Sequence, residues 1–171
     1  NWERIQNWDP NFNSNCAREA VFSFKGDTYV GLDAETLNEK EIKFAQNHLR
    51  ILSGLYGVLR PLDLIMPYRL EMGTKFQNSR GENLYKFWGT KLSSYLSKEL
   101  YQHKQKYIIN CASVEYFKSL DNSDLKAEII TPVFKEIRLG KPKIISFFAK
   151  KARGKMARYI VQNQINTKDQ I

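Results

Sequence analysis

The sequence predicts a mixed α+β fold, with a central mixed sheet flanked by helices. Apolar residues recur at three- and four-residue steps over residues 38–52 and 83–100, which is typical of helices. Short apolar runs at 106–110, 129–134 and 143–148 are instead typical of buried strands. The chain has 171 residues, 42% hydrophobic and 13% aromatic, which excludes a disordered protein. We therefore interpret the whole sequence, 1–171, as a single domain.

Local signals fix the start of the first long helix. Asn38 can cap it, and Glu41, three residues later, can complete a capping box, so a helix is expected over Asn38–Leu52. Before it, Phe22–Leu32 changes to a period of two and then turns, which predicts a strand followed by a loop. Near the end of the chain, Ala149–Ile160 is expected to be helical.

The stretch after the first long helix, Ser53–Gly57, contains two glycines three positions apart around an apolar pair. Glycine lets the backbone turn tightly and approach a neighbour closely. Two interpretations follow: an ordinary tight turn, or a helix-hairpin-helix that points backbone N–H groups at a phosphate. Pro61 and Pro67 exclude a long second helix directly after the turn.

Four charged residues follow among apolar neighbours: Arg60, Asp63, Arg69 and Glu71. They form either two ion pairs that tie a half-buried loop to the core, or a polar pocket. In the pocket, the arginines would bind a phosphate or carboxylate, and Asp63 or Glu71 would act as general base. Lys25 and Asp27 are either turn residues or further members of the same pocket.

Positive charge is concentrated late in the chain. The net charge is +9, and nine basic residues with one acid, Glu136, lie between Lys135 and Arg158. The remainder carries eighteen basic and seventeen acidic residues. A field confined to one segment favours a polyanionic partner.

The helix expected at Ala149–Ile160 would present this charge to a phosphate backbone. Its cations are expected on one arc, with Arg153 at the boundary: Lys150, Lys151, Lys155 and Arg158. The opposite side would pack on the protein through Ala149, Ala152, Met156, Tyr159 and Ile160.

Other classes of function have little support in the residues. Cys16 and Cys111 lie far apart, and His48 and His103 are isolated, so neither a metal site nor a disulfide framework is predicted. No cofactor is predicted and no signature of a known catalytic class occurs, so an enzyme is the alternative interpretation. No apolar run reaches the ~20 residues of a membrane span, and the cysteine usage fits the cytoplasm.

Five blocks of sequence resemble the YaaA family, also called DUF328 or UPF0246: Phe24–Leu32, Leu52–Asp63, Pro67–Gly73, Asn110–Phe117 and Phe148–Gly154. They cover nearly the whole chain in order, and the block from Leu52 to Gly73 is the most specific. Members of the family have a further N-terminal strand and a C-terminal stretch, so this sequence is expected to be the interior of a longer protein.

The resemblance implies a bacterial cytoplasmic protein of the peroxide stress response, which limits hydrogen-peroxide damage by keeping unincorporated intracellular iron low. It also implies an α/β fold with a basic cleft, a helix-hairpin-helix-like element and binding to duplex DNA. On this sequence the hairpin would be Ser53–Gly57, and the family's basic residues would be Lys150, Lys151 and Arg153.

The first hypothesis is therefore a protein that binds the phosphate backbone of duplex DNA without reading its sequence. The expected DNA-binding residues are Lys25, Ser53, Gly54, Tyr56, Gly57, Arg60, Arg69, Lys150, Lys151, Arg153, Lys155 and Arg158. The alternative is an enzyme that acts on a small anionic or nucleotide substrate in the pocket of Arg60, Asp63, Arg69 and Glu71.

Overall fold

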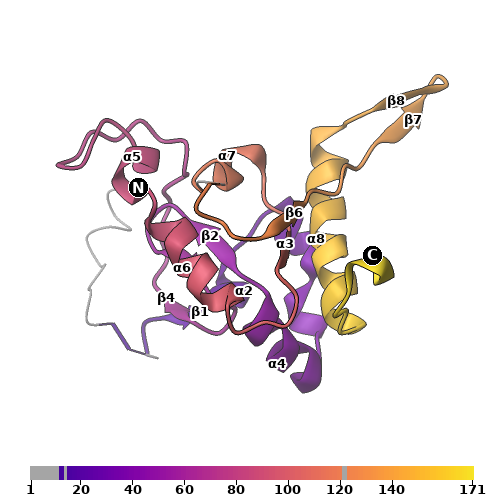
Figure 1. Cartoon of the computed structure of the whole chain (residues 1–171), viewed down its shortest axis with the longest axis horizontal. Coiled ribbons are helices and arrows are strands. Elements are labelled where there is room, and N and C mark those ends of the chain that lie inside the picture. The colour runs from indigo at the N-terminus through magenta and orange to yellow at the C-terminus, as the bar shows by residue number, and fades with distance from the viewer. Residues whose placement is uncertain (1–11, 14, 121–122) are drawn as a thin grey trace.

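In the part of the chain that the structure describes, the strands pair two by two. A computed structural model describes residues 12–13, 15–120 and 123–171 and confirms a mixture of helices and strands (Figure 1). The pairs are β1 (Arg18–Glu19) with β4 (Leu64–Ile65), β2 (Ile51–Ser53) with β3 (Gly57–Leu59), β5 (Tyr107–Ile109) with β6 (Glu128–Ile130), and β7 (Glu136–Arg138) with β8 (Lys141–Lys143). Only β5 and β6 run parallel. Within these residues no sheet exceeds two strands, so the expectation of one central sheet is wrong.

Helices form most of the remaining regular structure. They are α2 (Ala20–Ser23), α3 (Asp27–Leu32), α4 (Glu39–His48), α5 (Leu84–Trp88), α6 (Lys91–Leu100), α7 (Val114–Phe117) and α8 (Ser146–Gln162), with short 3₁₀ turns η1 (Ala34–Thr36) and η2 (Lys168–Gln170). The strand predicted within Phe22–Leu32 is wrong, because this stretch includes α3. The helix predicted within 149–160 is confirmed and begins earlier, so the strand expected at 143–148 is wrong over its last three residues.

The start of α4 is the one predicted. Asn38 Oδ1 accepts a hydrogen bond from the Glu41 N–H at 3.1 Å, and Glu41 Oε2 accepts one from the Asn38 N–H at 2.8 Å. The helix ends at His48 rather than at Leu52. Ile51 pairs instead with Leu59 across the β2–β3 hairpin, so strand pairing replaces the last helical turn.

The β2–β3 hairpin separates two clusters of buried side chains. Ile51 and Leu59 belong to a first cluster that includes residues of α2, α3, β4 and α8. Leu52 and Val58 face a second cluster built mainly from α5, α6 and the chain before β6. Successive strand residues point to opposite faces, so one short hairpin contributes to both clusters.

Helix α8 lies along one flank of the molecule and crosses α3 at very short distance (Figure 1). An added Cβ on Gly154 would lie 1.8 Å from the Thr28 carbonyl oxygen, and one on Gly31 would lie 2.1 Å from the Lys151 carbonyl oxygen. No side chain fits at either position unless the helices move apart. The β7–β8 hairpin projects beyond the N-terminal end of α8 (Figure 1).

Candidate nucleic-acid interface

The packed face of α8 runs through its small residues. Gly154, Ala157 and Val161 are its buried positions. Tyr159, which was expected to pack inward, is instead 49% exposed. Because the crossing at Gly154 places a residue without a side chain at the contact, the buried stripe cannot be found by following apolar residues alone.

Arg158 was expected on the solvent arc, but its side chain is directed into the fold. Its Nη1 donates hydrogen bonds to the carbonyl oxygens of Leu32 at 2.9 Å and Asp33 at 2.6 Å, and lies 3.7 Å from Asp33 Oδ2. These carbonyls end α3, where a cation is favourable for the helix dipole. Arg153 is half-buried and its Nε donates to the Ala149 carbonyl oxygen of its own helix at 3.4 Å.

The other cations of α8 remain closer to solvent. Lys150 and Lys155 are exposed, and Lys151 is half-buried. Lys150 Nζ lies 4.0 Å from Asp27 Oδ2, a loose contact at the first turn of α3. Lys25 is also exposed. Because it precedes Asp27 by two residues, it lies at the end of α3 that Lys150 of α8 approaches.

The β7–β8 hairpin continues the same positive charge. Lys135, Lys141 and Lys143 are exposed, and no described acidic group lies within ion-pair distance of any of them. Arg138 is also exposed and pairs with Glu136 at 2.8 Å. The basic segment of the sequence thus forms one continuous unit, a hairpin followed by a helix. We call its available cations the arm–helix surface: Lys135, Lys141, Lys143, Lys150, Lys151 and Lys155.

The turn at Ser53–Gly57 joins two antiparallel strands, so the tight-turn interpretation is confirmed and the helix-hairpin-helix is wrong. Ser53, Gly54 and Gly57 are buried. A Cβ on Gly54 would meet the Leu70 carbonyl oxygen at 2.4 Å, and the Trp88 indole N–H donates to the Gly54 carbonyl oxygen at 3.0 Å. The glycines therefore let the turn pack directly against the protein.

Hydroxyl groups complete the packing of this turn. Ser53 Oγ and the Tyr68 hydroxyl lie 2.5 Å apart, and the Tyr56 N–H donates to Ser53 Oγ at 2.8 Å. The Tyr56 hydroxyl in turn accepts a hydrogen bond from the Met66 N–H at 3.1 Å. Burial raises the pKa of Tyr68 to about 12, so its hydroxyl stays neutral at physiological pH. Ser53 and Tyr56 act here as structural residues, and we leave them outside the arm–helix surface.

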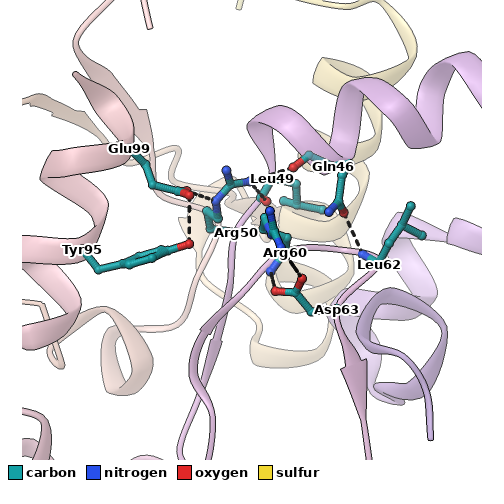
Figure 2. Close-up of polar contacts among 8 residues, drawn as sticks. All are labelled: Gln46, Leu49, Arg50, Arg60, Leu62, Asp63, Tyr95 and Glu99. Atoms are coloured by element: carbon teal, nitrogen blue, oxygen red, sulfur yellow. Dashed lines mark hydrogen bonds and ion pairs between the residues drawn. The ribbon is translucent and has the colours of Figure 1, made fainter. Parts of the chain in front are cut away.

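The four charged residues of the alternative pocket form two local ion pairs, as one interpretation predicted. Arg60 Nε donates to Asp63 Oδ1 at 3.1 Å, and Arg69 Nε to Glu71 Oε1 at 2.9 Å (the first pair is drawn in Figure 2). No described contact joins the two pairs. The hydrogen bond from Arg69 holds the pKa of Glu71 below its ordinary value, whereas a general base works best with a pKa raised toward neutral pH.

Figure 2 also shows what surrounds the first pair. Arg50 bridges to Glu99 of α6, which also accepts a hydrogen bond from the Tyr95 hydroxyl at 2.8 Å. Gln46 of α4 accepts a hydrogen bond from the Leu62 N–H at 2.8 Å. These contacts join α4, α6 and the loop after β3, so the charges here connect elements of the fold.

Two further features of the described residues concern metals and membranes. No three His, Cys, Asp or Glu side chains among them are grouped so that they could hold a metal ion. None of the helices in this part of the chain is long and apolar enough to cross a bilayer. Burial raises the pKa of the Cys111 thiol to about 11, which makes it a poor nucleophile at neutral pH.

Together, these features define a mixed α+β protein with a cationic helix and hairpin. Similar proteins carry the name UPF0246. One from Aliivibrio fischeri (strain ATCC 700601 / ES114) is 55% identical over 168 residues, 98% of this chain and 65% of that protein. One from Saccharophagus degradans is 56% identical over 171 residues, 100% of this chain and 67% of that protein. One from Shewanella sp. (strain W3-18-1) is 53% identical over 171 residues, 100% of this chain and 66% of that protein.

A comparison with protein families matches residues 1–171 to the family described as peroxide stress protein YaaA. The chain belongs to this family, which confirms the resemblance found in the sequence. It spans about two thirds of the length of the relatives it matches.

Proposed function

We propose that this protein acts in the peroxide stress response as a DNA-binding protein that grips the phosphate backbone of duplex DNA through the arm–helix surface. The observation that carries the proposal is the distribution of charge in the fold. Lys135, Lys141, Lys143 and Lys155 have no acidic partner among the described residues, and Lys150 has only a 4.0 Å contact. A backbone phosphate can take the place of the missing partners.

Arg60, Arg69 and Arg158 contribute less in this proposal, because each guanidinium already binds groups of the protein. Lys25 and Arg153 lie beside the surface and extend it. Contacts of this kind neutralise phosphates without touching base edges, so binding is independent of sequence. DNA occupancy is then the protein's contribution to limiting hydrogen-peroxide damage. The lowering of unincorporated iron, in the cytoplasm, is a separate expectation from the family.

The test is the salt dependence of binding to a short duplex, measured by fluorescence anisotropy. About six phosphate contacts give a slope of about −5 in log K against log salt, or roughly a thousandfold loss of affinity between 50 and 200 mM salt. Replacing Lys150, Lys151 and Lys155 together by glutamine makes the slope shallower by about 2.7, because about 0.9 is lost per phosphate contact.

A charge-matched control separates contact from net charge. Lys40 and Lys43 on α4 and Lys98 on α6 are exposed lysines outside the arm–helix surface. Replacing these three by glutamine removes the same number of charges and leaves the slope unchanged. If the two triple variants lose affinity equally, or if binding does not depend on salt, the proposed surface is wrong.

The enzyme alternative has less support. It needs the two arginines and two carboxylates in one pocket, whereas each arginine is bound by the carboxylate two or three residues away. Arg60, Arg69 and Glu71 are also exposed to solvent, where such ion pairs contribute little energy, and Asp63 is half-buried. We therefore propose no reaction at these residues.

A further inference from the structure

The tip of the β7–β8 hairpin carries an apolar residue that the fold does not use. Arg138 pairs with Lys141, so the two strands are joined by a two-residue turn of Leu139 and Gly140. The φ angles of these residues, 50° and 72°, are those of a type I′ turn. Asparagine is common at the first of these positions, whereas leucine rarely adopts positive φ.

Leu139 gains no burial in return for this conformation. Its relative exposure is 102%, and that of Ile137 on the same hairpin is 76%. An exposed apolar residue in an unfavourable backbone conformation lowers the stability of the folded chain. Its use therefore lies in contact with another molecule.

Charge and shape indicate what this molecule is. Residues 135–143 contain four basic residues and one acid, and Arg138 and Lys141 stand on either side of the tip. A narrow two-stranded ribbon can enter the minor groove of DNA. Proteins that bend DNA insert apolar side chains between base pairs from that groove. Cations beside the wedge bind the phosphates that flank the opened step. The ribbon also leads directly into α8, the other half of the arm–helix surface.

We propose that β7–β8 is a DNA-bending arm whose Leu139 inserts between neighbouring base pairs while Lys141, which has no acidic partner among the described residues, contacts a flanking phosphate. This inference rests on the proposed DNA binding and adds a preference to it. Unstacking costs least where bases are mismatched. The arm therefore favours mismatched or easily kinked duplexes over stiff, fully paired ones.

The decisive variant is Leu139→Asn, which removes the wedge and places a residue suited to a type I′ turn. We expect the wild-type chain to bind a duplex with one central mismatch about tenfold more tightly than its fully paired counterpart, a difference of about 1.4 kcal/mol. Leu139→Asn lowers this ratio to about one and leaves the affinity for the paired duplex nearly unchanged. Bending, measured by energy transfer between dyes at the duplex ends, falls with it.

Two further variants make the comparison specific. Leu139→Met keeps an apolar wedge and retains both the preference and the bend. Val114→Asn removes another highly exposed apolar side chain, 87% exposed at the start of α7, and leaves both unchanged. A urea unfolding midpoint for Leu139→Asn at or above that of wild type verifies that the chain still folds.

The outcomes distinguish the two proposals. If wild type binds DNA with the expected salt slope but Leu139→Asn keeps the same mismatch ratio and bend, the arm proposal is overturned and the DNA-binding proposal stands. If wild type binds no DNA, both are overturned. Two other outcomes would also overturn the arm proposal. If Leu139→Asn abolishes binding of the protein to phosphatidylserine vesicles without changing DNA binding, the tip contacts a membrane. If it abolishes self-association in sedimentation velocity without changing DNA binding, the tip contacts a second copy of the chain.

Discussion

The crossing of α3 and α8 gives a sharp test of the fold, because the sign of one substitution depends on it. An alanine Cβ at Gly154 would lie 1.8 Å from the Thr28 carbonyl oxygen and 2.8 Å from the Leu32 nitrogen. Ordinary contact begins at 3.4 Å, so the helices would have to separate by about 1.6 Å. Both obstacles are backbone atoms of α3, which cannot rotate away as a side chain can.

Two opposing terms set the size of the effect. Replacing glycine by alanine inside a helix gains about 1 kcal/mol of helix propensity. Overpacking a contact costs about 1–3 kcal/mol, and more where backbone must shift. Separation also loosens Ala157, which is buried one turn later. We therefore expect Gly154→Ala to lower the free energy of unfolding by about 2 kcal/mol, because the steric term exceeds the propensity term.

Urea unfolding followed by circular dichroism measures this change. With a slope of about 2 kcal/mol per molar urea, the midpoint falls by about 1 M. Gly31→Ala has the same sign, since its Cβ would lie 2.1 Å from the Lys151 carbonyl oxygen. Gly73→Ala is the control, because the nearest atoms to its Cβ would belong to the Glu115 side chain, with Oε1 at 3.0 Å, and not to backbone. A midpoint that rises for Gly154→Ala, as propensity alone requires, would show that the two helices do not cross at this distance.

Two further predictions concern buried ionisable groups. Burial raises the pKa of Tyr68 from 10.0 to about 12, so as the pH rises the unfolded chain loses this proton before the folded chain does. The stability that this difference contributes is therefore complete below pH 10 and is lost as the pH rises toward 12. Tyr68→Phe should flatten that alkaline fall in the urea midpoint and cost about 1 kcal/mol at neutral pH through the lost bond to Ser53; an unchanged fall would contradict the burial of this hydroxyl. Cys16 is exposed, whereas burial raises the pKa of Cys111 to about 11. Ellman's reagent at pH 8 should therefore titrate one thiol rapidly and the second only in denaturant, and two equally fast thiols would refute this assignment.

Local interactions explain which elements the sequence could predict. The cap of α4 depends on hydrogen bonds between Asn38 and Glu41, three residues apart, so it could be predicted from spacing alone. The end of that helix could not. Leu49 and Leu52 continue the helical stripe, yet Ile51 pairs with Leu59, and this tertiary pairing outweighs the local pattern.

The same limit applies to α3. Its β-branched and aromatic residues, Thr28, Tyr29 and Val30, favour a strand by propensity. The helix forms because Gly31 lets it pack directly on the backbone of α8, a contact between positions more than a hundred residues apart. Nothing within the segment itself carries that information.

The candidate interface could be predicted as a charge but not as a set of residues. Counting basic residues located the segment from Lys135 to Arg158. Only the fold separates Lys155, which is exposed, from Arg158, which binds the end of α3. The hairpin lysines lay within the counted segment and could have been named from it, since four cations and one acid surround a Leu-Gly turn.

Packing and charge are distributed over α8 so that each can be altered separately. Gly154, Ala157 and Val161 are the buried positions of the helix, and Gly154, which has no side chain, lets its backbone approach α3 closely. A helix packed this way needs no large apolar residues on its inner side, so most of its other positions are free to carry cations. Arg158 is the exception, because it is a cation that serves packing: its guanidinium donates hydrogen bonds to the carbonyl groups that end α3. The close approach of Gly31 and Gly154, each to the backbone of the facing helix, is therefore the physical reason that one helix can both hold the fold together and present positive charge to a partner.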